Sequence, residues 1–231
     1  MATVSETPYP AARDVLVAQL RELSADDFAS RLVLDRVPWL FSDRRQYIDW
    51  KTSLALELEL DPYMLLVVGS ACLGFSLSPF KRFTEFGSRS DIDVAAVSER
   101  YFDEAWRWLR DLGPENLPER DELEQEMFRW HRRNLVFDGA IATEKLLPRL
   151  PFGDRWMSAL GHAGNQEPTV GRKINVRIYR DFESLRKYHV TNIRNLKLEL
   201  IAEEADTSPR SLPRMKEDDQ EYRVEGEETV L

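Results

Sequence analysis

The chain has 231 residues, of which 42% are hydrophobic, and it carries a formal charge of −9 and one cysteine. This length supports one sizeable core with a small helical addition, and the net charge argues against a surface that binds nucleic acid all over, because phosphate binding needs clustered Lys and Arg. One cysteine excludes an internal disulfide and a multi-cysteine zinc site.

No apolar stretch reaches the roughly 18 residues of a membrane span, and the longest apolar run, Met64 to Val68, is the length of a strand. No basic segment followed by an apolar one opens the chain. We therefore expect a cytoplasmic protein with no membrane partner.

Residues 1–42 are predicted to form an N-terminal helical segment. The first ten residues contain two prolines and lead into a helix over 12–23, where apolar residues recur at helical spacing. A second helix is predicted over 43–60, with Ser42 or Asp43 as its cap and Asp61-Pro62 as its end.

Two short apolar runs that are rich in β-branched residues, 64–68 and 92–97, predict strands. The segment between them, 75–90, is rich in Ser and Gly and predicts a long loop after a short helical turn. Its cations Lys81, Arg82 and Arg89 are candidates for contact with a triphosphate or an acidic substrate, although loop charges are more often only solvated.

The second half of the chain is predicted to begin with a helical insertion over about 101–165, with helical patterns at 101–112, 123–137 and 141–147. Residues 173–179 alternate as in a half-buried strand, and a helix capped by Asp181 follows to residue 204. We predict a nucleotidyltransferase-like domain over 43–204, on grounds given below, and a disordered acidic tail over 205–231.

The most informative residues are Gly69-Ser70, after the first strand, and Asp91 and Asp93, at the start of the second. A glycine lets the backbone turn tightly and approach a ligand, and the free amides at the start of a helix favour phosphate. Two aspartates two residues apart on a strand project from the same face, so both carboxylates can bind one hard cation. Mg²⁺ (or Mn²⁺) takes few protein carboxylates and fills its other positions with water and substrate phosphates.

This arrangement resembles the DNA polymerase β-like nucleotidyltransferase superfamily, which pairs a Gly-Ser turn with an Asp-x-Asp strand. The resemblance covers about 54–97 and, by general order only, 172–200. It implies an α/β (α+β) core with a short mixed sheet packed by helices, of the compact bacterial kind. It also implies Asp91 and Asp93 as catalytic and metal-binding residues, and Gly69, Ser70 and Lys187 as nucleotide- or phosphate-binding residues.

Two features depart from that family. The gap between Ser70 and Asp91 is long, which implies an insertion across the mouth of the site. Members also carry a third carboxylate on a neighbouring strand, where this sequence offers Asn175 and Arg177. An arginine there can act as an internal cation in place of a metal ion.

Two functions from different classes follow. The first is an Mg²⁺-dependent enzyme that transfers a nucleoside monophosphate from a nucleoside triphosphate to a hydroxyl of a small molecule, a protein or an RNA end. Compact members often act in toxin–antitoxin or phage-defence systems. The second is a catalytically inactive binding or regulatory module with a protein partner. A purely structural helical adaptor requires both motifs to be coincidental.

Overall fold

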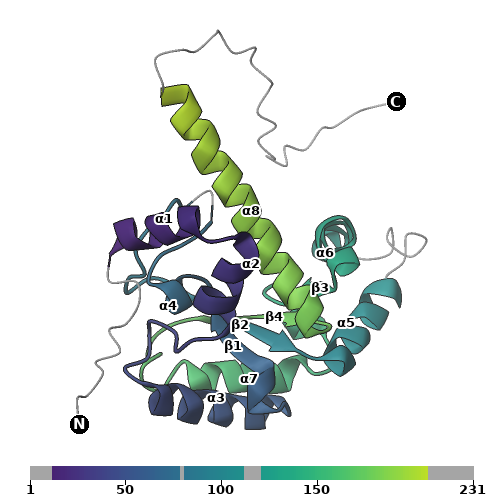
Figure 1. Cartoon of the computed structure of the whole chain (residues 1–231). Helices are drawn as coiled ribbons and strands as arrows, with labels where there is room; N and C mark the ends of the chain where they lie inside the picture. The colour runs from purple at the N-terminus through teal and green to yellow at the C-terminus, as the bar shows by residue number, and fades with distance from the viewer. Residues whose placement is uncertain (1–11, 79–80, 112–120, 208–231) are drawn as a thin grey trace, which may run out of the picture. The chain divides into compact units, whose positions relative to one another are not determined.

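The computed structural model describes residues 12–78, 81–111 and 121–207, and the chain divides into two compact units, Met1–Lys197 and Leu198–Leu231. The first unit contains the whole sheet (Figure 1). Of the second, the structure describes only the end of one helix, Leu198–Thr207. The expected lead-in over the first ten residues lies outside the described residues. The disordered tail was expected over 205–231, but its first three residues belong to this helix, and the rest of it lies outside the described residues.

The first half of the chain begins with three helical elements, and the sequence pattern predicts a separate helix only for the first of them. They are α1 (Arg13–Glu22), α2 (Ala25–Phe28) and the π-helical η1 (Ala29–Leu34). Then follow α3 (Arg44–Leu58), the 3₁₀ turn η2 (Pro62–Met64), β1 (Leu65–Val68), α4 (Gly69–Leu73) and β2 (Ile92–Val97). As predicted, Asp43 caps α3, because its carboxylate accepts a hydrogen bond from the Gln46 amide at 2.8 Å.

The second half is mainly helical but adds two strands. Its elements are α5 (Glu99–Asp111), α6 (Glu122–Asn134), η4 (Val136–Asp138), β3 (Ala140–Ala142), η5 (Leu147–Arg149), α7 (Gly153–Ala163), β4 (Ile174–Tyr179) and α8 (Phe182–Thr207). The predicted cap of the last helix is also present, since Asp181 accepts from the Ser184 amide at 2.7 Å. None of the described helices combines the length and apolar character that a membrane crossing needs.

The four strands form one mixed sheet in the order β1-β2-β4-β3. β1 and β2 are antiparallel, β2 and β4 are parallel, and β4 and β3 are antiparallel. The expected short mixed sheet packed by helices is therefore confirmed at this coarse level. The parallel pair places Asp93 beside Asn175 and Ala95 beside Arg177.

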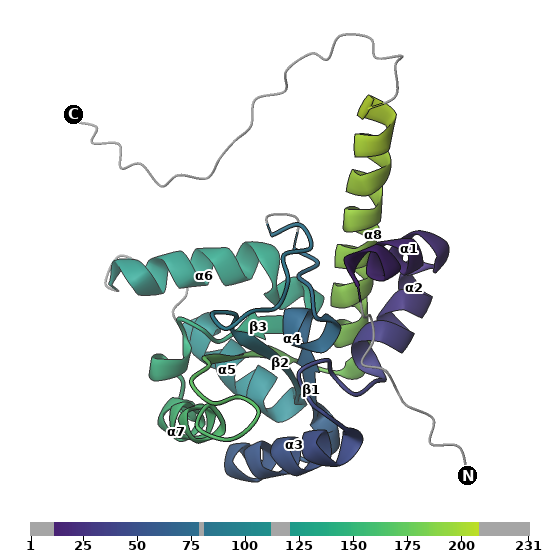
Figure 2. The same ribbon diagram turned by 90° about the vertical axis from the view of Figure 1, so that its left-hand side faces the viewer.

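One face of the sheet carries the main core. Side chains such as Val94, Val176 and Ile178 pack there against α3, α5 and α7, and α3 and α7 run side by side under the sheet in both views (Figures 1 and 2). The buried indole of Trp50 donates to the Thr169 hydroxyl at 3.0 Å, which ties α3 to the segment before β4. This layer holds the sheet rigid beneath the other face.

The opposite face of the sheet is partly covered by α4 and by the first turns of α8. α4 contacts both β1 and β2, and the Tyr188 ring of α8 lies 5.6 Å from the Tyr179 ring of β4. The N-terminal segment is tied to α8 by an ion pair between Arg194 and Asp26 at 2.8 Å. The motif residues Asp91 and Asp93 belong to this face, because they alternate with the core residues Ile92 and Val94.

The structure corrects two details of the sequence prediction. Residues 141–147 were expected to be helical, but Ala140–Ala142 form the edge strand β3, which pairs with β4. The strand 173–179 was expected to be half-buried, but every residue of β4 (Ile174–Tyr179) except Arg177 is buried, because β4 is an inner strand with covered faces. Asn175 is only 9% exposed.

Candidate functional site

The turn at Gly69 joins β1 to α4 and lies against β2 at Asp93. Gly69 has a φ of 66°, a left-handed conformation that favours glycine, and α4 begins at this residue. A Cβ atom added here would lie 2.8 Å from Oδ2 of Asp93. The backbone at Gly69 therefore lies too close to the Asp93 carboxylate for a residue that has a Cβ atom. The strand register explains this closeness, because Val68, the residue before Gly69, pairs with Asp93.

Ser70 follows in the first turn of α4, a helix of only five residues. Its hydroxyl takes part in none of the hydrogen bonds within the described residues, and its backbone carbonyl accepts from the Gly74 amide at 2.8 Å. The first amides of a helix have no partner inside it. Ser70 thus adds a hydroxyl and local amides next to the Gly69 turn.

Asp91 and Asp93 lie on the same sheet face, as their spacing predicts. Asp91 just precedes β2 and accepts a hydrogen bond at 3.2 Å from the side-chain amide of Asn175 on the neighbouring strand. Asn175 therefore holds Asp91 in place. The strand expected to supply a third carboxylate supplies an amide donor to the first.

Glu144 is the acidic residue that sequence reasoning missed. It follows β3, and Thr143 anchors that point by donating its hydroxyl to the Val176 carbonyl at 2.6 Å. In the β3–β4 register Ala142 faces Arg177, and Glu144 follows two residues after the end of β3, at the end of the sheet that carries Asn175. The negative charge of Glu144 is felt at Asp93.

The pKa of Asp93 is raised, mainly by burial of its carboxyl group. The charge of Arg177 opposes this rise, the charges of Glu144 and Asp91 add to it, and Lys81 opposes it weakly. Solvent reaches Asp93, yet the surrounding protein encloses it enough to disfavour its charged form. Asp93 is therefore affected by the negative charges of Glu144 and Asp91 and by the positive charge of Arg177.

Lys81 is the loop cation whose charge reaches the site. Its loop folds back on itself through a bridge between Phe75 and Glu85, and the buried Phe83 and Phe86 side chains anchor it. The guanidinium of Arg172 donates to the carbonyl oxygens of Gly87 at 2.6 Å and Ser90 at 3.2 Å. These contacts hold the loop against the start of β2.

Lys187, the predicted phosphate ligand on the last helix, is engaged differently. Its ammonium group lies 3.5 Å from the Asp138 carboxylate in an exposed pair. The main charges that act on the pKa of Asp93 are those of Arg177, Glu144, Asp91 and Lys81. The structure therefore brings together Gly69, Ser70, Asp91 and Asp93, but does not show Lys187 with them.

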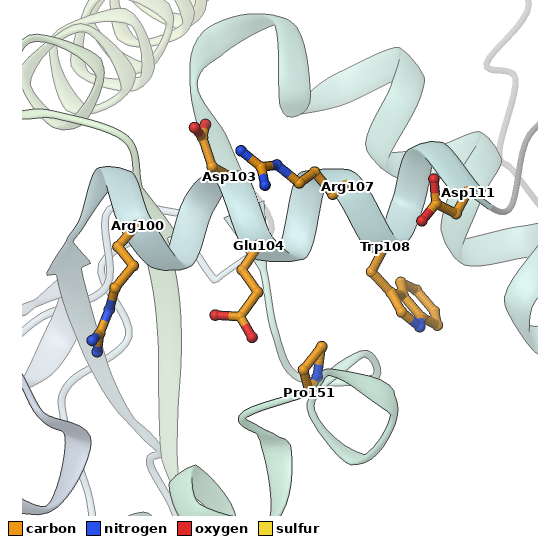
Figure 3. Close-up of a pocket in the computed structure, with 7 residues that line it drawn as sticks. All are labelled: Arg100, Asp103, Glu104, Arg107, Trp108, Asp111 and Pro151. Atoms are coloured by element: carbon orange, nitrogen blue, oxygen red, sulfur yellow. The ribbon is translucent and has the colours of Figure 1, made fainter.

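A separate cavity lies along α5, where Figure 3 shows Glu104 and Trp108 directed toward Pro151 and Arg107 extended toward Asp103. Arg100 and Asp111 also line it. Its charges have both signs and none of the predicted site residues contributes to it. We therefore place the candidate site on the sheet face at Asp93.

Comparison with protein-family models, with curated proteins and with solved structures found no match. Within the described residues, no group of three or more His, Cys, Asp or Glu side chains is close enough together to hold a metal ion. The case for function therefore rests on the geometry of this one sheet face.

Proposed function

We propose that this protein is a nucleotidyltransferase of the DNA polymerase β-like kind, which transfers a nucleoside monophosphate from a nucleoside triphosphate to a hydroxyl group. The observation that carries the proposal is the contact between the Gly69 turn and the Asp93 carboxylate across the β1–β2 register. Such a contact brings a turn of the phosphate-binding type next to a carboxylate pair of the metal-binding type.

The acidic residues fit a divalent cation in type and number. Asp91 and Asp93 offer two carboxylates on one face, which is what Mg²⁺ or Mn²⁺ takes from a protein when phosphates and water complete its coordination. Burial raises the pKa of Asp93, and the charges of Glu144 and Asp91 add to this rise, so a bound cation would favour the charged form of Asp93. When bound, the cation would polarise the phosphates and help to ionise the attacking hydroxyl.

The residues of the chain have distinct roles in this scheme. Gly69 and Ser70 bind phosphate oxygens, Asn175 orients Asp91, and Glu144 is the further carboxylate beside Asp93. The acceptor oxygen forms a bond to the α-phosphorus as the bond to pyrophosphate breaks, and the hydroxyl proton passes to a carboxylate. Preorganised carboxylates and donors are the main source of rate enhancement in such transfers.

The acceptor in this proposal is a small molecule, a protein side chain or the end of an RNA, and the biological setting is toxin–antitoxin or phage defence. These choices come from the family resemblance. The cytoplasm is the compartment in which the triphosphate would be met.

A second function, an inactive binding or regulatory module with a protein partner, is favoured by two observations. Asn175 occupies the β4 position next to Asp93, and the charge of Arg177 reaches the Asp93 carboxylate. A resident cation there can replace a metal ion. This alternative keeps the fold but predicts no Mg²⁺-dependent binding of nucleotide.

Thermal unfolding separates the two functions. We expect one nucleoside triphosphate with Mg²⁺, at about 100 times its Kd, to raise Tm by roughly 5–10 °C, because a ligand bound only to the folded state stabilises it. Asp91→Asn/Asp93→Asn should lose this shift, and Glu144→Gln should reduce it. Asp49→Asn is the matched control, since Asp49 is an exposed residue of α3 paired with Arg45.

No shift with any triphosphate, with or without Mg²⁺, would overturn the enzyme and leave the binding module. A shift that needs no Mg²⁺ and survives in Asp91→Asn/Asp93→Asn would also favour the module, because the carboxylate pair would then have no part in binding. Transfer of radiolabelled nucleotide to a cellular extract identifies the class of acceptor once the triphosphate is known.

A further inference from the structure

Arg177 is a partly buried cation on the same sheet face as Asp93. It lies on β4 opposite Ala95 of β2, two residue pairs beyond Asp93 and Asn175. Nη1 of its guanidinium donates a hydrogen bond to the hydroxyl of Tyr188, and the guanidinium carbon lies 4.7 Å from the centre of the Tyr188 ring. The side chain is therefore held by a residue of another element, α8.

Tyrosines fix the position of this guanidinium. Tyr188 packs edge-on against Tyr179, with ring centres 5.6 Å apart, and Tyr179 lies two residues beyond Arg177 on the same strand face. Both hydroxyls interact with Arg177. Burial raises the pKa of Tyr179, so this hydroxyl stays neutral near pH 7. The tyrosines orient the cation but supply no negative charge.

Arg177 also lacks a carboxylate in direct contact. Among the described residues, the ion pairs join other arginines to acids, such as Arg149 to Asp121 at 2.9 Å and Arg194 to Asp26 at 2.8 Å, and none includes Arg177. Its charge reaches Asp93 only at longer range. Burying a cation without an anion in contact with it costs free energy. An anionic ligand bound to Arg177 would offset that cost.

We propose that Arg177 binds the polyphosphate chain of the nucleoside triphosphate and that Tyr188 is the positioning residue that aims it. This inference rests on the proposed function and names a further part of the same site. A guanidinium has five N–H donors, of which the tyrosine hydroxyls use only some, and planar donor pairs match phosphate oxygens. Arg177 is then a ligand for substrate and not a substitute for a metal ion.

The position of Arg177 suits this role. The Gly69 turn contacts Asp93 from the β1 side of the acidic strand, whereas Arg177 stands on β4 on the other side of it. A triphosphate lying across the carboxylates can therefore meet the Ser70 hydroxyl and the Arg177 guanidinium from opposite sides. Such a cation compensates the charge that accumulates on the pyrophosphate leaving group.

Binding of inorganic tripolyphosphate, measured by titration calorimetry without Mg²⁺, tests the proposal because this probe has no base, sugar or metal. We expect the native protein to bind it and Arg177→Met to weaken binding by about tenfold or more, as expected for a lost charge-assisted contact. Arg177→Lys should recover part of the affinity. Tyr188→Phe, which keeps the ring, should weaken binding several-fold. Arg45→Met is the control, since Arg45 is an exposed arginine of α3.

The outcomes distinguish this inference from the proposed function. Unchanged tripolyphosphate binding in Arg177→Met and Tyr188→Phe, with Mg²⁺-triphosphate binding still lost in Asp91→Asn/Asp93→Asn, overturns the role of Arg177 and leaves the enzyme intact. Arg177-dependent binding of tripolyphosphate without any Mg²⁺-dependent nucleotide binding supports the anion site and removes the enzyme. No binding of tripolyphosphate by the native protein overturns the inference. Should Arg177→Met fail to fold, Arg177→Lys and Tyr188→Phe decide alone.

Discussion

At the scale of single residues, two features of the structure require a glycine at Gly69, and their effects can be measured separately. Its φ of 66° strains any other residue, and an added Cβ would press on Oδ2 of Asp93 at 2.8 Å. We expect Gly69→Ala to lower the free energy of unfolding by about 1–2 kcal/mol from the backbone alone. It should also displace the Asp93 carboxylate, and Mg²⁺-dependent binding of triphosphate, followed by thermal shift, should disappear.

Gly171 is the matched control for this prediction. It has a similar φ of 72°, but an added Cβ would meet no atom within 4 Å. Gly171→Ala should therefore show the backbone cost without the loss of ligand. Equal loss of binding in both variants would mean that the contact between Gly69 and Asp93 has no functional part.

Asp93 also shows what a sequence can and cannot reveal about a site. The Gly-Ser turn and the Asp-x-Asp pattern predict Gly69, Ser70, Asp91 and Asp93 as site residues, and the structure shows Gly69 against Asp93. Strand alternation and a tight turn are local properties that a sequence pattern reveals. Glu144 was missed because its position depends on the β3–β4 register, which pairs residues about 35 apart in sequence. No local pattern marks it.

At the scale of elements, the segment that leads into β2 depends on one arginine. Arg172 binds the Gly87 and Ser90 carbonyls, and its guanidinium carbon lies 4.6 Å from the centre of the Phe86 ring. We expect Arg172→Met to loosen this segment, so that trypsin cleaves after the exposed Arg89 about fivefold faster, as loss of roughly 1 kcal/mol of local hydrogen bonding implies.

Mass spectrometry of the early tryptic fragments measures that change. Arg45→Met serves again as the control, because Arg45 forms only an exposed ion pair. An unaltered cleavage rate after Arg89 would show that the buried Phe83 and Phe86 side chains hold the loop without Arg172.

The elements themselves were predictable where their patterns were long or β-branched. The strands at 64–68, 92–97 and 173–179 and the capped helices at Asp43 and Asp181 all agree with the structure. The sequence pattern predicts helix where β3 lies, because Ala140-Ile141-Ala142 has neither alternation nor β-branched enrichment beyond one residue, and only pairing with β4 makes it a strand. Pairing with a neighbouring strand, and not local conformational preference, therefore determines the structure of this segment.

At the scale of the whole molecule, His189 links stability to pH. Its Nε2 atom is buried and has no hydrogen-bond partner among the described residues, and burial together with the charge of Arg177 lowers the pKa of His189 to about 4. The unfolded chain, with an ordinary pKa of 6.5, binds this proton more readily. The contribution to stability is therefore complete above pH 6.5 and is lost as pH falls toward 4.

The loss amounts to about 3 kcal/mol at most, at 1.36 kcal/mol for each pKa unit. We expect His189→Gln to show a shallower fall in the free energy of urea unfolding between pH 7 and 4.5 than the native protein. Subtracting one pH profile from the other removes the contributions of the titrating groups that both proteins share. One of these is Asp93, whose raised pKa makes the folded state more stable as pH falls. Parallel pH profiles would mean that His189 accepts a proton without penalty in the folded protein.

The ties between the N-terminal segment and α8 have a consequence for the order in which the protein forms. Arg194 to Asp26, Arg186 to Ser30 and Lys197 to Leu23 join residues 168, 156 and 174 positions apart. During synthesis, α1, α2 and η1 leave the ribosome first, yet their partners on α8 appear only after the whole sheet has been made. These elements therefore complete their packing only after α8 has been made, and closing such long loops slows folding. Until then, the buried side chains of that segment are exposed to chaperones and proteases.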